Sequence, residues 1–224
     1  MAISNSLQAV KNRIAAACVA AHRTPDAVRL LVVSKTFPAT AVRQAFEAGA
    51  RAFGENYVQE GLAKIGELAD RRGQIEWHLI GPLQSNKTRP VAEAFDWVQS
   101  VDRLKIAERL SEQRPAGLPP LNVCLQVNIS GEASKSGLLP GEVPALARQV
   151  AALPRLKLRG LMAIPEPGPD AAAQHHAMAA LFDALKAAEP DVDTLSLGMS
   201  ADLEAAIAAG STMVRVGTAV FGAR

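Results

Sequence analysis

Short apolar runs alternate with amphipathic segments along the whole chain. Apolar or β-prone runs occur at residues 29–35, 50–56, 75–81, 95–101, 121–130, 156–164, 194–200 and 213–218. Runs of this kind predict strands that are buried on both faces. Helical periodicity separates several of them, at residues 38–49, 102–113, 141–153, 175–188 and 201–210.

This alternation is the order that a parallel α/β barrel requires. Eight strands, most of them followed by a helix, predict a single (β/α)₈ TIM barrel that spans residues 1–224 as one domain. A doubly wound open sheet is the alternative, because alternation alone does not show that the sheet closes. The Pro/Gly-rich stretches at residues 114–120 and 164–170 are too short to separate domains.

An extra helix is expected before the first strand. Five apolar residues between Leu7 and Ala21 fall at helical spacing, which indicates an amphipathic helix. A secretory signal is the alternative, but the apolar stretch at residues 14–21 is short, and His22 and Arg23 follow it. No segment is long enough to cross a membrane.

Composition and charge narrow the class of protein. The chain is 49% hydrophobic and 21% charged, as is ordinary for a globular domain. Its formal net charge of +2 gives no electrostatic reason to expect a nucleic-acid or membrane partner. Cys18 and Cys124 show no metal or redox spacing, so we expect reduced core residues in a cytoplasmic protein.

The ends of the last two predicted strands carry groups suited to an anion. In barrels of this kind, function lies at the carboxyl ends of the strands, and the last two loops often hold a phosphate. In "LGMSADLEAAI" we expect Ser200 to cap a helix whose first N–H groups face an anion. In "VRVGTAVFG", Gly217 permits close backbone approach and Thr218 offers an N–H and a hydroxyl. The pair predicts a phosphate site; plain helix capping and an ordinary turn are the alternative.

Two cationic side chains lie near this predicted phosphate site. Lys35 ends the first strand, which neighbours the eighth in a closed barrel, and a lysine there could form a Schiff base. A phosphate site with a nearby lysine is what pyridoxal 5′-phosphate (PLP) requires. Arg215 alternates with Val214 and Val216, so it faces away from them and could donate to the pyridine nitrogen. The alternatives are a solvated lysine and a structural salt bridge inside the barrel.

These residues lie within stretches that resemble one family over nearly the whole chain. The matching stretches are "VVSKTFP", "FGENYVQE", "WHLIGPLQSNK", "VNISGEASKSG", "GLMAI" and "LSLGMSADLEAAIAAGSTMVRVGTAVFG". The chain resembles the pyridoxal phosphate homeostasis family of single-domain PLP-binding proteins. It departs from the family pattern conservatively, for example at Leu79 and Leu197, where phenylalanine and methionine are expected.

The resemblance implies a fold, a cofactor and a set of site residues. The fold is a barrel of the alanine racemase N-terminal domain type, and the cofactor is PLP. The resemblance places Lys35 at the aldehyde as the Schiff-base lysine, Ser200, Gly217 and Thr218 at the phosphate, Arg215 at the pyridine nitrogen, and Asn56, Met162 and Met199 around the ring.

Two functions from different classes are compatible with such a site. One is a carrier or buffer that holds PLP and releases it to apo-enzymes in vitamin B6 and amino-acid homeostasis; the other is a PLP-dependent amino-acid racemase. Alanine-type racemization uses a lysine and a tyrosine on opposite faces of the cofactor, the tyrosine coming from a second domain of a partner chain. The single tyrosine here is Tyr57, and no residues remain for a second domain after the eighth strand. We therefore expect a non-catalytic, monomeric carrier.

Three further polar residues stay without an assigned role. His78 lies on the third predicted strand, where a lone histidine is more often a satisfied core residue than a catalyst. Lys87 and Lys135 could accept or relay an aldehyde near the entrance, and solvated loop charge is the alternative. We expect none of the three to be catalytic.

Overall fold

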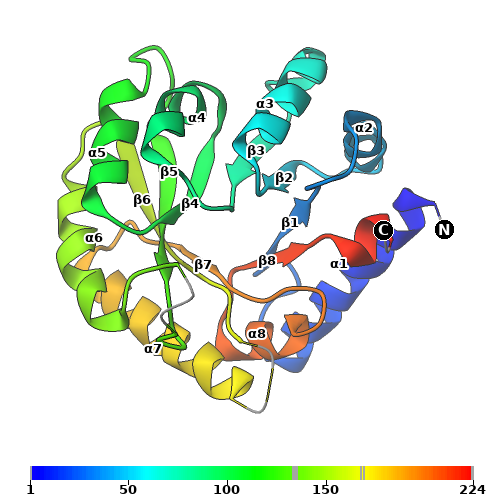
Figure 1. The fold of residues 1–224 in the computed structure, drawn as a ribbon. Coiled ribbons are helices and arrows are strands. Elements are labelled where there is room, and N and C mark those ends of the chain that lie inside the picture. Colours follow the sequence, from blue (N-terminus) through cyan, green and yellow to red (C-terminus); the bar gives the residue numbers. More distant parts are fainter. Residues whose placement is uncertain (1, 133–135, 167, 169, 223–224) are drawn as a thin grey trace.

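Eight parallel strands form a closed barrel in the computed structural model, which describes residues 2–132, 136–166, 168 and 170–222 (Figure 1). The strands are β1 (Arg29–Val33), β2 (Ala52–Glu55), β3 (Glu76–Leu79), β4 (Trp97–Val101), β5 (Leu121–Val127), β6 (Leu156–Ala163), β7 (Thr194–Ser196) and β8 (Met213–Val216). Each strand pairs with its sequence neighbours, and β1 closes the barrel onto β8 with Leu31 opposite Arg215. This order confirms the barrel and excludes the open sheet.

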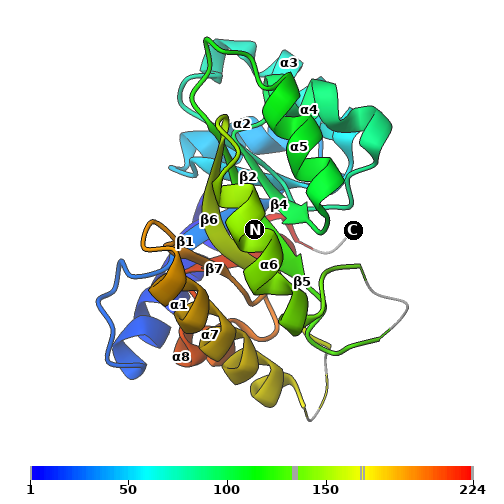
Figure 2. The same ribbon diagram turned by 90° about the vertical axis from the view of Figure 1, so that its left-hand side faces the viewer.

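Helices surround the barrel on its outside (Figures 1 and 2). They are α1 (Ile3–Ala20), α2 (Ala39–Glu47), α3 (Val58–Glu67), α4 (Thr88–Ala94), α5 (Leu104–Gln113), α6 (Val143–Ala151), α7 (Ala171–Ala188), α8 (Leu203–Ala209) and α9 (Thr218–Phe221), with 3₁₀ turns η1 (Ala69–Arg71), η2 (Ser85–Lys87) and η3 (Pro140–Glu142). The predicted eighth strand was two residues too long, because the chain turns at Gly217 and enters α9 at Thr218.

The N-terminal helix α1 is amphipathic, as the spacing of its apolar residues predicts. Leu7, Val10, Ile14 and Cys18 on this helix are buried. The helix lies against α8 and α9, so it joins the beginning of the described chain to its end (Figure 1). Within the described residues, no helix has the combination of length and apolar character that crossing a membrane requires.

Strand β8 divides its side chains between two environments. Val214 and Val216 of β8 belong to the large core that the barrel shares with the helices. Met213, on the opposite face of the strand, belongs to a small separate cluster with Leu31. Arg215 shares the face of Met213, so alternation directs its guanidinium into the barrel, as the sequence pattern predicts.

Gly160 on β6 lies against the backbone of β7. Its φ is +151°, and a Cβ atom there would lie 1.8 Å from the carbonyl oxygen of Thr194. We expect Gly160→Ala to lower the free energy of unfolding by roughly 1–3 kcal/mol, because it combines backbone strain with a clash between strands. Urea denaturation measures this loss.

Gly66 on α3 provides the matched control. A Cβ atom at this position would have no neighbour within 4 Å. Gly66→Ala should therefore stabilise the protein by about 0.4–1 kcal/mol. Equal effects of the two substitutions would contradict the strand contact as the reason for glycine at position 160.

Candidate cofactor site

A hollow of about 630 Å³ opens at the carboxyl ends of the strands. Seven of the eight residues predicted for the cofactor lie in its wall. The described wall residues are Val33, Lys35, Phe37, Asn56, Ile80, Ile164, Met199, Ser200, Ala201, Arg215, Gly217, Thr218 and Gly222. The closed barrel therefore brings together predicted site residues that are up to 183 positions apart, Lys35 and Thr218.

Met162 is the predicted residue that the structure places elsewhere. Its side chain is fully buried and packs with Trp97 and Cys124 in a cluster of its own inside the barrel. The strand position was assigned correctly, but the side chain points to the barrel interior. Met162 therefore does not contribute to the described wall of the hollow.

Lys35 lies in a tight turn directly after β1. The turn is closed by the Phe37 N–H, which donates to the Ser34 carbonyl oxygen at 3.1 Å. Thr36, the residue after the lysine, has a φ of +66°, a left-handed conformation that is uncommon for a β-branched residue. Phe37 stacks on Phe221 with ring centroids 4.6 Å apart, which covers one side of the hollow.

The side of the hollow where the sequence predicts the phosphate is formed where β8 meets β1. A Cβ atom at Gly217 would lie 2.9 Å from the carbonyl oxygen of Val33, so this close approach favours glycine. Thr218 follows and begins α9. In the part of the chain that the structure describes, the hydroxyls of Ser200 and Thr218 form no hydrogen bond to protein, so both remain as donors at the wall.

The expected helix cap at Ser200 was wrong. Helix α8 begins at Leu203, and Asp202 occupies its N-cap position. The Asp202 Oδ1 accepts the N–H of Met199 at 2.7 Å, which folds residues 199–202 into a turn ahead of the helix. Ser200 thus reaches the hollow from a turn rather than from the first turn of a helix.

Neutral oxygens inside the barrel hold the guanidinium of Arg215. Its side chain is buried, with 4% of its surface exposed. Nη1 donates to the carbonyl oxygen of Ser196 at 2.7 Å and to its hydroxyl at 2.8 Å, and Nη2 donates to the carbonyl oxygen of Ala163 at 2.8 Å. Among the described residues it has no carboxylate partner, so the structural salt bridge considered from the sequence is not observed. Burial lowers the pKa of Arg215 to about 10, which leaves it charged at neutral pH.

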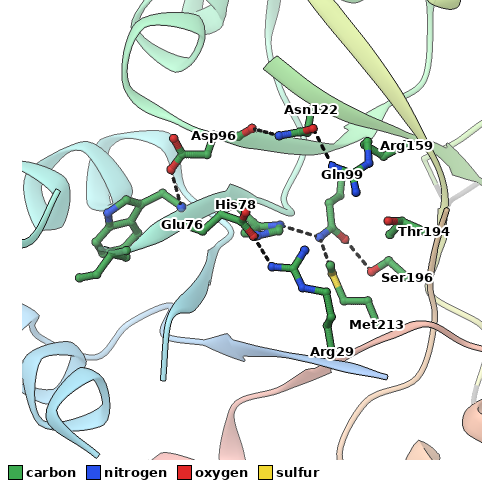
Figure 3. A network of polar contacts seen from close by, with 12 residues as sticks. Arg29, Glu76, His78, Asp96, Gln99, Asn122, Arg159, Thr194, Ser196 and Met213 are labelled. Atoms are coloured by element: carbon green, nitrogen blue, oxygen red, sulfur yellow. Dashed lines mark hydrogen bonds and ion pairs between the residues drawn. The ribbon is translucent and has the colours of Figure 1, made fainter. Parts of the chain in front are cut away.

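From Ser196, a chain of hydrogen bonds crosses the barrel to its opposite mouth (Figure 3). The Ser196 hydroxyl donates to Gln99 Oε1 at 2.6 Å, and Gln99 Nε2 donates to His78 Nδ1 at 3.0 Å. His78 Nε2 then bonds Glu76 Oε1 at 2.8 Å, and the same oxygen accepts from Arg29 at 2.7 Å. Ser196, Gln99 and His78 each accept one hydrogen bond and donate another in this series, while Glu76 only accepts and Arg29 only donates.

This series of hydrogen bonds indicates a structural role for His78. Nδ1 accepts from Gln99, so the ring proton lies on Nε2, which donates to Glu76. The ring is fully buried and stacks on Trp97 with centroids 4.9 Å apart. His78 does not line the hollow, which agrees with the expectation of a satisfied core histidine.

Other candidate side chains lie away from the hollow or outside the described structure. Lys87 ends the short turn η2 and does not belong to the described wall. Lys135 lies outside the described residues. Tyr57 is 60% exposed and also does not belong to that wall.

Comparison with known proteins places the chain in a family. Residues 6–224 match the alanine racemase N-terminal domain family. The chain is 64% identical to the pyridoxal phosphate homeostasis protein of Pseudomonas aeruginosa, over 99% of this chain and 96% of the relative. It is 57% identical to that of Escherichia coli K12, over 99% and 97% of the two chains. The chain belongs to the pyridoxal phosphate homeostasis protein family.

Solved structures agree with this membership in the pyridoxal phosphate homeostasis family. PipY of Synechococcus elongatus, solved with PLP bound, is 38% identical, with a TM-score of 0.80 over 93% of this chain and 100% of PipY. Alanine racemase from Corynebacterium glutamicum is 18% identical, with a TM-score of 0.71 over 100% of this chain and 61% of the racemase, and shares the fold. The alanine-racemase-type barrel is thereby confirmed.

Several site residues of this family member were missed from the sequence. Apolar wall residues such as Ile80 and Ile164 directly follow β3 and β6, so their position after a strand was an available signal. Gln99 and Ser196, which support Arg215, are 97 positions apart and gave no local signal. Both are polar residues within otherwise apolar strands, and their role can be recognised only when the structure of the barrel is known.

Burial lowers the pKa of His78; the bond with Glu76 opposes the shift and nearby Arg29 reinforces it. Below about pH 6.5 the unfolded chain takes up a proton that the folded ring excludes, so the free energy of unfolding should fall with decreasing pH by up to about 1.4 kcal/mol per unit. We expect His78→Gln to flatten this dependence between about pH 5 and 6.5. Denaturant unfolding across that range measures the slope.

The exposed His176 provides the matched control for this titration. His176→Gln should leave the slope unchanged, because this side chain is exposed on α7 and is not enclosed in the barrel. A slope that His78→Gln does not alter would contradict a neutral buried His78.

Proposed function

We propose that this protein binds PLP in the hollow at the carboxyl ends of the strands. PLP carries a phosphate, an aldehyde and a pyridine nitrogen, and the wall presents hydroxyl donors, an amine and a guanidinium. The observation that carries the proposal is that Lys35, Arg215 and Thr218 share one hollow of about 630 Å³. The names of the relatives and the PLP in PipY support the same cofactor.

Each of these wall residues has a distinct role in this proposal. Lys35 supplies the amine that holds the aldehyde carbon as a Schiff base, with release of water. Ser200, Gly217 and Thr218 bind the phosphate, and Arg215 donates a hydrogen bond to the pyridine nitrogen. Asn56 and Met199 lie against the ring. When bound, PLP supplies an electrophilic aldehyde and an electron-withdrawing ring.

The function that these groups support best is retention of PLP, not turnover. A protonated guanidinium keeps the pyridine nitrogen unprotonated, which weakens the ring as an electron sink. Racemization also needs a second proton-transferring group across the ring, and Tyr57 does not line the described hollow. The relatives are named as homeostasis proteins. We therefore propose a carrier or buffer in vitamin B6 and amino-acid homeostasis.

The remaining expectations belong to the same proposal. We propose that residues 1–224 act as one PLP-binding domain, that the protein is a cytoplasmic monomer, and that apo PLP-dependent enzymes receive the cofactor. The free, buried state of Cys18 and Cys124 supports a reducing compartment. The modest net charge of +2 supports the absence of nucleic-acid or membrane partners.

Covalent retention on Lys35 is tested by chemical trapping. Purified protein loaded with PLP should be yellow, and borohydride should fix the cofactor on the peptide that contains Lys35. Lys35→Ala should be colourless and should trap none, while Lys87→Ala should behave as wild type because Lys87 is not in the described wall. Peptide mass spectrometry reads the label, and trapping chiefly on another lysine would refute the assignment.

A measurement of amino-acid racemization distinguishes a carrier from a racemase. PLP-loaded protein incubated with L-alanine or L-serine should produce no D-isomer beyond that formed by an equal concentration of free PLP. Chiral chromatography over many equivalents of amino acid makes the comparison. Sustained racemization that Lys35→Ala abolishes would overturn the carrier function and leave PLP binding intact.

A further inference from the structure

A buried cluster of charged side chains lies behind the turn that carries Lys35. Lys64 of α3 is 4% exposed, and Glu55 at the end of β2 is fully buried. Lys64 Nζ lies 2.8 Å from Glu55 Oε1 and 2.7 Å from Glu60 Oε1. None of the three lies in the described wall of the hollow, so the roles assigned to the cofactor site do not account for them.

The cluster holds the chain on both sides of Lys35. Lys64 Nζ also donates to the carbonyl oxygen of Ser34 at 2.6 Å, and the Ser34 hydroxyl donates to Glu55 Oε1 at 2.6 Å. On the other side, the backbone N–H of Thr36 donates to Glu60 Oε1. The residue before the lysine and the residue after it are thus fixed by the same three side chains.

The backbone of this turn requires such support. The φ of +66° at Thr36 places a β-branched residue in the left-handed region, which is sterically unfavourable. Conformations of this kind persist where the surrounding structure determines them, and they cluster at functional sites. The bond from Thr36 to Glu60 acts on the strained residue itself.

Stability alone does not account for the cluster. Burying a lysine and a glutamate desolvates both, and well-packed apolar side chains in place of a buried ion pair are often neutral or stabilising. Glu55 Oε2 has no hydrogen-bond partner within the described residues. Burial raises the pKa of Glu55, although Lys64 and Ser34 oppose that shift. The cluster therefore has a desolvation cost, and its hydrogen bonds to the turn indicate that its role is to fix the backbone there.

We propose that Glu55, Glu60 and Lys64 are positioning residues, which fix the turn at residues 34–36 so that the Lys35 amine is held at the aldehyde end of the cofactor site. This inference rests on the proposed function and extends it to residues that do not touch PLP. A turn fixed in advance reduces the conformational freedom lost when the covalent bond forms. Loosening the turn should therefore speed the release of PLP.

Glu60 provides the mildest test, because its side chain is partly exposed and its removal leaves Lys64 paired with Glu55. In Glu60→Ala we expect PLP to dissociate about tenfold faster, the effect of losing a hydrogen bond to a charged acceptor. Glu60→Gln keeps an oxygen that can accept from Thr36 and should restore the rate to within about twofold of wild type. Release is followed by the absorbance of the bound cofactor, together with the pH midpoint of that absorbance band.

A paired variant separates positioning from stability. Glu55→Gln combined with Lys64→Met removes both buried charges, so it should unfold at the same temperature as wild type or higher when PLP-free. We still expect it to release PLP about tenfold faster, because the hydrogen bond from Lys64 to the Ser34 carbonyl oxygen is lost and the bond from the Ser34 hydroxyl to residue 55 is weakened. Asp70→Ala is the control: it removes an acid paired with Arg43 that does not contact the turn, and release should be unchanged.

The outcomes distinguish this inference from the proposed function. If borohydride fails to label Lys35 in wild-type protein, the proposed function fails and the positioning role fails with it. If wild-type protein is labelled but Glu60→Ala and the paired variant release PLP at the wild-type rate, only the positioning role is overturned. Faster release that merely follows lower thermal stability, or that Asp70→Ala reproduces, would also overturn it.

Discussion

The interior of this barrel depends on one constraint: the guanidinium of Arg215 is buried and has no carboxylate partner among the described residues. Arg215 remains charged at neutral pH, and burying a charge is costly unless its donors are satisfied. Neutral oxygens of Ser196 and Ala163 satisfy them. The Ser196 hydroxyl must then be oriented by Gln99, and Gln99 by His78. The barrel interior is therefore partly polar, and its polar residues are linked in one sequence of bonds.

This arrangement connects the fold to the chemistry of the site. The same guanidinium that the interior supports from below faces the hollow above. A fixed positive charge at a pyridine nitrogen holds the cofactor and discourages its protonation. A lysine at the barrel rim often indicates catalysis, but beside Arg215 it suits retention. In the proposed function, both the binding of PLP and its limited reactivity would depend on this one buried side chain.

The sequence was sufficient where a feature is local or periodic. Apolar runs predicted the eight strands, and strand alternation predicted that Arg215 points into the barrel. Features that depend on the assembled structure were missed: Met162 turns into the interior cluster, and Asp202 rather than Ser200 caps α8. The hydrogen bond from Ser196 to Gln99 joins strands that are distant in the sequence. The left-handed φ of Thr36 could not be predicted, because a glycine is the usual sequence signal for that conformation and position 36 is a threonine.

The protonation state of the pyridine nitrogen tests the central claim most directly. Nitrogen-15 NMR of ¹⁵N-labelled PLP bound to the full-length protein distinguishes a protonated from an unprotonated ring nitrogen. We predict an unprotonated nitrogen across neutral pH that accepts a hydrogen bond, with a changed chemical shift in Arg215→Lys. A protonated nitrogen in the wild-type protein would contradict the role of Arg215 and the argument for retention over catalysis.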